Sequence, residues 1–162
     1  MISERLIFSH YTESDFDDYY RLVSNADVMK MVTGRPHLEQ EARERLAKML
    51  KINQEFPKIG HYKVTLRFDG DFVGHSKLMM TERNEAELGY LLMPEHWGKG
   101  FGSEIAKTLV NLAKQMDEIQ NVIAIIDPEN VASKKILERQ GFLWDYNDEY
   151  IGLPAAYYKM EV

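Results

Sequence analysis

Three glycines lie close together in the segment 97–104, which reads Trp-Gly-Lys-Gly-Phe-Gly-Ser-Glu. The segment follows an apolar stretch and precedes a helical pattern. Because glycine has no Cβ, its backbone adopts positive φ and approaches a ligand closely. The first N–H groups of a helix lack partners and carry partial positive charge. The segment therefore predicts a strand–loop–helix cradle for a phosphate or pyrophosphate, in preference to an ordinary turn with surplus glycine.

The spacing of these glycines excludes two other phosphate-binding motifs. A dinucleotide fingerprint needs G-x-G-x-x-G, whereas this chain has Gly98-x-Gly100-x-Gly102. A P-loop needs Ser or Thr directly after its lysine, and Gly100 follows Lys99. What remains is a compact nest of N–H groups that leads into a helix. Lys99 either adds a positive charge to the pyrophosphate or is simply solvated.

Composition limits the classes of protein to which the chain can belong. Its 162 residues suit one domain over 1–162, and the absence of cysteine excludes disulfides, thiolate metal sites and a cysteine nucleophile. The net charge of −6 comes without a basic run, so we expect no nucleic-acid partner. The same charge favours a cationic substrate, or does no more than confer solubility.

Apolar runs and metal-ligand patterns are also informative. No apolar run approaches the roughly 20 residues that span a bilayer, and the first residues lack the pattern of a signal peptide. We therefore expect a cytoplasmic protein with no membrane partner. No group of His, Asp and Glu has the spacing of a metal site, so we expect no metal.

The order of predicted elements indicates a mixed α/β fold. Strands are expected at 5–8, 61–68, 71–80, 86–93, 122–126, 142–151 and 155–161, and helices at 14–24, 38–56, from the glycines to about 116, and from 127–130 to 141. Asp69-Gly70 is typical of a hairpin turn. The continuously apolar strand 122–126 predicts a central position covered on both faces. The fold class is therefore α/β, with a mostly antiparallel mixed sheet and one strand–helix–strand crossover.

Two segments resemble the motifs of one known superfamily. Residues 87–104, from Glu-Leu-Gly-Tyr to Gly-Ser-Glu, resemble the acetyl-CoA-binding motif of the GNAT N-acetyltransferases, and in particular the branch that includes the ribosomal-protein N-terminal acetyltransferases. A second motif, Asn130-Val-Ala-Ser and Leu137-Glu-Arg-Gln-Gly-Phe, is similar as well. Together with the N-terminal strand and the 69–70 hairpin, the resemblance covers nearly the whole chain. Trp97 is common in that branch, whereas Leu137 stands where the superfamily often has a tyrosine general acid.

The resemblance implies a fold, a cosubstrate and a reaction. These are an acyl-CoA N-acyltransferase fold, acetyl-CoA, and direct attack on the thioester by a primary amine in a ternary complex. The amine belongs to a protein or peptide N-terminus or to a small molecule. Homodimers are frequent in the superfamily, and the sequence leaves the oligomeric state open. A non-catalytic CoA-sensing domain and an interaction module that keeps only the fold are the rival functions.

The resemblance also implies which residues bind acetyl-CoA. They are Leu91, Leu92, Met93, Trp97, Gly98, Lys99, Gly100, Phe101, Gly102, Ser103 and Asn130. The backbone of 98–103 would hold the pyrophosphate, and 91–93 would pair with the pantetheine as a further strand, unless their side chains are core. An N–H near Leu92 or Met93 would face the thioester oxygen. Asn130 contacts the pantetheine, caps the helix, or does both.

Proton transfer needs its own side chains. Glu87 is the first candidate for the base that deprotonates the amine, with a solvated edge glutamate as the alternative. His75 is the second candidate, although a structural histidine is also expected in mid-strand. His61 and His96 are weaker candidates. The resemblance implies that Ser133 hydrogen-bonds the leaving sulfur or donates a proton to it; the alternative is a surface serine.

Two further groups bear on the acceptor amine. Tyr19, Tyr20, Met29 and Met31 form either an apolar or cation–π wall for the amine or ordinary core. Asp145, Asp148 and Glu149 either attract a cationic acceptor or form a solvated charged loop.

Overall fold

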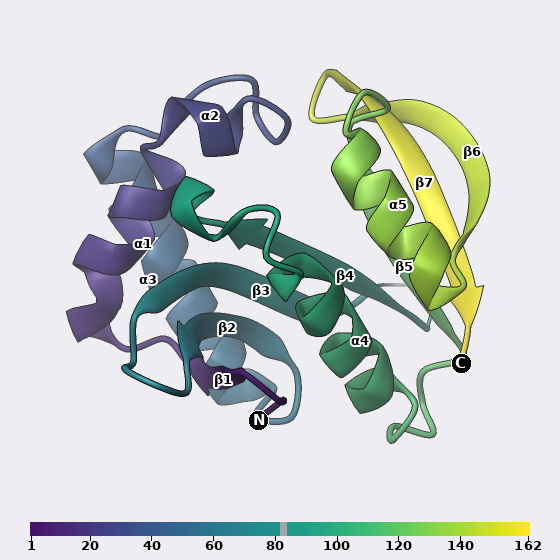
Figure 1. The fold of residues 1–162 in the computed structure, drawn as a ribbon, viewed down its shortest axis with the longest axis horizontal. Coiled ribbons are helices and arrows are strands. Elements are labelled where there is room, and N and C mark those ends of the chain that lie inside the picture. The colour runs from purple at the N-terminus through teal and green to yellow at the C-terminus, as the bar shows by residue number, and fades with distance from the viewer. Residues whose placement is uncertain (82–83) are drawn as a thin grey trace.

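A single seven-stranded sheet organises the chain. The computed structural model describes residues 1–81 and 84–162, and Figure 1 shows the sheet with helices on both of its faces. The strand order is β1-β2-β3-β4-β5-β7-β6. The strands are β1 (Leu6–His10), β2 (Gly60–Leu66), β3 (Phe72–Met80), β4 (Glu85–Leu92), β5 (Asn121–Ile126), β6 (Leu143–Tyr150) and β7 (Leu153–Glu161). The α-helices are α1 (Phe16–Val23), α2 (Ala26–Met29), α3 (Glu39–Glu55), α4 (Phe101–Ala113) and α5 (Val131–Gln140), and the 3-10 helices are η1 (Glu13–Asp15) and η2 (Pro94–His96).

The central pair of strands is the parallel pair β4 and β5. Their paired residues run from Glu85 and Asn121 only as far as Leu88 and Ala124. Beyond that point β4 continues to Leu92 and β5 to Ile126, and Figure 1 shows the two strands diverging towards α5 on one side and α2 on the other. The sheet therefore forks at its centre, and Gly89 to Leu92 have a partner strand on the β3 side alone.

The two faces of β4 are covered by different helices. A Cβ added to Gly102 of α4 would lie 3.4 Å from the Tyr90 ring and 3.7 Å from Leu92, so α4 packs closely on that face. Leu91 packs instead against the core cluster formed by α1, α2 and α3. Because successive side chains of a strand point to opposite faces, the two helical layers lie on opposite sides of the sheet.

Most of the predicted elements are confirmed. The hairpin of β2 and β3 turns at Gly70, where φ is +80°, and the crossover β4–α4–β5 is the parallel unit that the pattern predicts. α2 was not expected from the sequence. α4 ends at Ala113, so Met116 lies beyond it. No helix in the described ranges is long and apolar enough to cross a membrane.

One expectation about burial is wrong. Strand β5 does lie centrally, but only Val122 and Ala124 are fully buried, whereas Ile123 and Ile125 on the other face are half-buried. α5 covers the sheet on one side here, and the opposite side opens into a cavity lined by Ile125. A run of apolar residues cannot distinguish a second protein layer from the wall of a binding site.

The last paired position before the fork is expected to be critical for stability. Leu88 is 2% exposed, so Leu88→Ala should lower the free energy of unfolding by about 2–5 kcal/mol, because it leaves a cavity in the core. Leu143→Ala is the matched control at a side chain that is 75% exposed, and it should change stability by less than about 0.5 kcal/mol. Urea denaturation measures both, and equal losses would contradict this account of the core.

Candidate functional site

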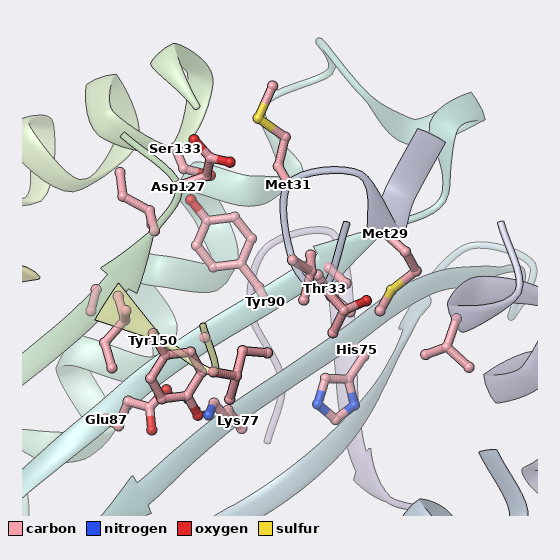
Figure 2. Close-up of a pocket in the computed structure, with 18 of the residues that line it drawn as sticks. Met29, Met31, Thr33, His75, Lys77, Glu87, Tyr90, Asp127, Ser133 and Tyr150 are labelled. Carbon is pink, nitrogen blue, oxygen red and sulfur yellow. Dashed lines mark ion pairs between the residues drawn. The ribbon is translucent and has the colours of Figure 1, made fainter. Parts of the chain in front are cut away.

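A cavity of about 420 Å³ begins at the fork between β4 and β5 and extends to α1, α2 and α3. Its volume is in the usual range for small-molecule sites. Figure 2 shows labelled side chains of its wall, from Ser133 and Asp127 beside α5 to His75 and Met29 on the far side. The lining includes Tyr19, Met29, Met31, His37, Arg45, Lys48, Met49, Ile52, His61, His75, Lys77, Glu87, Tyr90, Leu91, Asp127, Asn130, Ser133 and Leu137.

The glycine segment forms the strand–loop–helix turn that the sequence predicts. Gly98 has φ of +71° and Gly100 has φ of +81°, a backbone conformation that other residues adopt with strain. Gly100 is the N-cap of α4, so the first N–H groups of that helix follow it directly. Because no side chain caps them, these groups can donate to an anion. That the anion is a pyrophosphate remains a prediction.

Arg5 holds this loop in place, a role that the sequence did not reveal. Its guanidinium donates to the Lys99 carbonyl at 2.9 Å, pairs with Glu104 at 2.8 Å and lies 4.4 Å from the centroid of the Phe101 ring. Burial raises the pKa of Glu104, but hydrogen bonds from Ser3 and Arg5 outweigh it, so the pKa is lowered. Arg5, which directly precedes β1, thereby holds residues before and after the start of α4.

Two aromatic residues before the glycines are also anchored. The indole N–H of Trp97 donates to the Leu92 carbonyl at 2.9 Å, and the Trp97 side chain is 48% exposed. His96 is buried, contacts Asp71 at 3.1 Å and meets Phe101 edge-on. Both residues connect the loop to strand ends, so they position it. A direct contact of Trp97 with the cofactor remains a prediction.

The end of β4 corrects one candidate for thioester recognition. The Met93 N–H donates to the Val73 carbonyl at 2.9 Å, and the Met93 side chain is buried among α1, α2 and α3. Met93 is therefore wrong as a donor to a thioester oxygen, because its N–H already has a partner in the protein. Leu92 remains the candidate. Leu91 lines the cavity and also packs against the core, so both interpretations hold for it.

Glu87 lies in the cavity wall as part of an ion pair. Its carboxylate is 2.6 Å from Lys77 Nζ, and each side chain is about one-quarter exposed or less. Lys77 is paired in register with Gly89, and its side chain crosses the space that a Cβ there would fill, with Cε only 2.9 Å away. Gly89 therefore gives Lys77 the room to reach Glu87. The sequence identified Glu87 but not its partner.

The histidines of the cavity wall form a chain of close contacts. His61 Nδ1 lies 3.4 Å from His75 Nε2, and His75 Nδ1 lies 3.3 Å from the Tyr11 hydroxyl. Burial, with Lys77 nearby, lowers the pKa of His61 to about 4. Burial, His61 and Lys77 lower the pKa of His75 well below its usual value. Both imidazoles are therefore neutral near pH 7.

The α5 side of the cavity brings four polar residues together. Asn130 caps α5 by accepting the Ser133 N–H at 3.0 Å, so the capping interpretation of Asn130 is confirmed. Leu137 is fully buried. The hydroxyl of Tyr90 is buried without a hydrogen bond of ordinary geometry to any described residue, and Figure 2 shows it pointing towards Ser133 and Asp127. Burial raises the pKa of Tyr90, partly offset by the Ser133 hydroxyl.

Tyr90 is thus a polar residue of the site that sequence reasoning missed. Alternation along β4 indicates that Tyr90 faces away from Glu87, but it does not reveal that α5 carries Ser133 to the same place.

The remaining acceptor-side candidates separate into two groups. Tyr19, Met29 and Met31 line the cavity, whereas Tyr20 stacks on Phe16 outside it. The three acidic residues of β6 are exposed and do not line the cavity, which favours their solvated interpretation; they are Asp145, Asp148 and Glu149. Within the described ranges, no three His, Asp or Glu side chains are grouped so that they could hold a metal ion.

Comparison with known proteins gives a consistent family. A family model described as "Acetyltransferase (GNAT) domain" matches residues 5–143. The chain is 26% identical to a Bacillus licheniformis protein named "Uncharacterized N-acetyltransferase p20", over 90% of this chain and 86% of that one.

Solved structures share the fold of this chain. A GNAT-family acetyltransferase from Bacillus anthracis superposes with a TM-score of 0.85 at 21% identity, over 99% of this chain and 97% of that one. The RimL ribosomal L7/L12 alpha-N-protein acetyltransferase in complex with coenzyme A gives 0.82 at 18% identity, over 100% and 97%. At these identities, the two structures support the fold.

The buried histidines should make stability depend on pH. In the unfolded chain the pKa of an imidazole is near 6.5, whereas burial lowers the pKa of His61 in the folded protein to about 4. As the pH falls, the unfolded state binds protons first, so the free energy of unfolding should decrease from about pH 6.5 towards pH 4. His61→Gln should make this decrease smaller. Urea denaturation across this range measures the slope, and a His61→Gln slope equal to that of the unmodified protein would contradict the assignment.

Proposed function

The chain belongs to the acetyltransferase (GNAT) family, and from this premise we propose that it transfers an acetyl group from acetyl-CoA to a primary amine that enters the cavity. The observation that carries the proposal is the fork between β4 and β5, which opens beside the α4 N-terminus and leads into a cavity with Glu87 in its wall. The fork therefore lies between a candidate phosphate cradle at the α4 N-terminus and a cavity that holds a candidate base.

Acetyl-CoA binding would use backbone groups on two elements. The N–H groups that follow Gly98 and Gly100 would hold the pyrophosphate, since they are uncapped and Arg5 fixes the loop. The pantetheine would enter the fork, where Gly89 to Leu92 lack a partner strand on the β5 side, and would pair there like an added strand. The coenzyme A in the RimL complex supports this choice of cosubstrate.

Direct transfer requires a neutral amine. An alkylammonium with a pKa near 10 is mostly protonated at pH 7, so a base must remove one proton before the nitrogen attacks the thioester carbon. Glu87 is the proposed base, acting directly or through a water molecule. Its pairing with Lys77 at 2.6 Å holds the carboxylate in the cavity wall. The neutral His75 and His61 can accept hydrogen bonds but hold protons weakly.

The attack breaks the carbon–sulfur bond and leaves a thiolate that requires a proton. Leu137 cannot donate one, but the hydroxyls of Ser133 and Tyr90 face each other at the fork. The raised pKa of Tyr90 keeps it protonated near pH 7. Because an alkyl thiol has a pKa of about 8.5, modest help from these hydroxyls is sufficient. Ser133 and Tyr90 are therefore the proposed donors to sulfur.

Acetyl-CoA should raise the melting temperature of the protein, since a ligand at 100 times its Kd stabilises the folded state by about 2.7 kcal/mol.

Gly100→Ala should weaken acetyl-CoA binding at least tenfold, because a Cβ strains the loop at positive φ. Gly70→Ala carries the same strain in the β2–β3 turn, where φ is +80°, and should leave binding unchanged. Calorimetric titration measures the affinities. Equal losses in both variants would contradict a pyrophosphate site at this loop.

Glu87→Gln should lower the acetyl-transfer rate by about 10²–10⁴-fold and leave acetyl-CoA affinity unchanged, because it removes the base and not the cofactor site. Glu85→Gln is the matched control: Glu85 lies on the same strand, also pairs with a lysine at 2.6 Å, and does not line the cavity. Free-CoA release across pH measures both. A Glu87→Gln variant with an unchanged rate at every pH would remove Glu87 as the base.

A further inference from the structure

The charges in the cavity wall are arranged unevenly. Lys77 and Glu87 neutralise each other near the middle. The wall beside α5 holds the carboxylate of Asp127, and the wall formed by α3 holds Arg45 and Lys48. The cavity therefore has an acidic end next to the fork and a basic end farthest from it.

The basic end is built from one face of α3. Arg45, Lys48, Met49 and Ile52 line the cavity, and their spacing of i, i+3, i+4 and i+7 places them on a common side of the helix. The two cations therefore share a surface with apolar side chains that enclose the site. An acceptor that enters the cavity would meet both cations at its far end.

Among the described residues, neither cation at this end has an acidic partner. The acidic side chains at the start of α3 are used by other arginines, because Glu39 pairs with Arg43 and Glu41 with Arg35, each at 2.6 Å. Glu41 also accepts the Leu38 N–H. In the part of the chain that the structure describes, Arg45 and Lys48 form no ion pair. Two unpaired cations on a shared wall attract an anion.

A buried imidazole gives independent support. His37 lines the same cavity at 6% exposure, and its Nδ1 is buried with no hydrogen-bond partner among the described residues. Buried polar atoms are nearly always paired, so such an atom indicates a partner that is absent here. Burial and then Arg45 lower the pKa of His37, Glu41 partly opposes this, and Arg35 adds to the lowering. Arg45 also opposes the rise that burial causes in the pKa of Tyr19. Arg45 thus lies within electrostatic reach of both side chains.

The phosphates of acetyl-CoA do not explain this end of the cavity. α3 packs with the cluster that faces Leu91, whereas α4 and its glycine loop pack on the opposite face of β4, against Tyr90 and Leu92. A pyrophosphate on the α4 N-terminus would therefore be separated from Arg45 and Lys48 by the sheet. An anion bound at the α3 end would therefore belong to the acceptor.

We propose that the acceptor is a primary amine that also carries a carboxylate, bound with its carboxylate at Arg45, Lys48 and His37 and with its amine towards Glu87 and Asp127. This inference rests on the proposed acetyl transfer, for which it names the substrate class. The acidic end binds the ammonium of the acceptor before it is deprotonated, and the basic end binds the carboxylate of the acceptor. Free amino acids and short peptides with an acidic side chain both have this chemistry.

Matched acid and amide acceptors test the proposal. β-Alanine with β-alaninamide, and the C-terminally amidated dipeptides Gly-Asp-NH2 with Gly-Asn-NH2, are compared by free-CoA release. The acid of at least one pair should have a kcat/KM at least tenfold higher than its amide, because the amide loses the charge-assisted contacts. The first pair represents free amino acids and the second represents peptides. Added salt should reduce the preference, since the two cations are exposed at the surface.

Charge-removing variants test whether Arg45 and Lys48 of α3 cause the preference for the acid over the amide. Arg45→Gln and Lys48→Gln should each reduce the acid-to-amide ratio about tenfold. Lys51→Gln should keep it, because Lys51 is an exposed lysine of the same helix outside the cavity wall. Circular dichroism verifies that the variants fold. A ratio near one in the unmodified protein, or equal effects of all three variants, would overturn the proposal.

A binding measurement separates this inference from the proposed function. The acetylated products N-acetyl-β-alanine and N-acetyl-β-alaninamide are titrated into the protein in the presence of CoA, without turnover. Tighter binding of the acid, lost in Arg45→Gln, supports the carboxylate site even if no amine is acetylated. No acid preference in either binding or turnover overturns it. Failure of acetyl-CoA to bind would instead overturn the proposed function.

Discussion

Backbone pairing between β4 and β5 ends after Leu88 and Ala124, and the rest of the site depends on this limit. Up to that point the two parallel strands share a ladder, and α4 connects them as a crossover helix. Beyond it, the strands separate and leave one side of Gly89 to Leu92 without a partner strand. Unpaired strand backbone is a template for a further extended chain. A pantetheine arm has the amides and the linear shape to use it.

Side-chain contacts hold the elements around the fork in place. Arg5 holds the glycine loop through Lys99, Glu104 and Phe101, so the N-terminus of α4 is fixed relative to the sheet. On the other face, α1, α2 and α3 pack as a separate cluster and form the far wall of the cavity. In the proposed function, one layer would present backbone N–H groups to acetyl-CoA and the other would present side chains to the acceptor. Strand β4 lies between the two layers.

Much of the fold could be predicted from sequence because it depends on local signals. The glycine segment, the Asp69-Gly70 turn and the capping Asn130 each act within a few residues, and each forms the predicted local structure. The role of Asn130 towards a cofactor and the whole set of acetyl-CoA contacts remain predictions. Glu87 was found by its place in a motif, and the structure puts it in the cavity wall.

What the sequence could not predict depends on contacts between distant segments. Arg5 meets Glu104 across 99 positions, and Ser133 meets Tyr90 only because α5 lies beside the fork. The apolar sequence of β5 predicts burial on both faces of the strand. This prediction fails because hydrophobicity alone does not distinguish core residues from residues of a cavity wall. The prediction that the Met93 N–H faces a thioester oxygen is wrong for a similar reason, because this N–H donates to the Val73 carbonyl on the neighbouring strand. The sequence does not indicate that Arg45 and Lys48 line the cavity, because this depends on where α3 packs.

Amide hydrogen exchange with and without acetyl-CoA, followed by mass spectrometry, tests the central claim most directly. The account predicts that acetyl-CoA slows exchange in two separate segments, 89–92 on the open side of β4 and 98–103 in the glycine loop. Those N–H groups would gain partners there, and exchange in β6 should stay unchanged. Slowed exchange confined to other segments, or unchanged exchange in the presence of bound acetyl-CoA, would contradict a cofactor site at the fork.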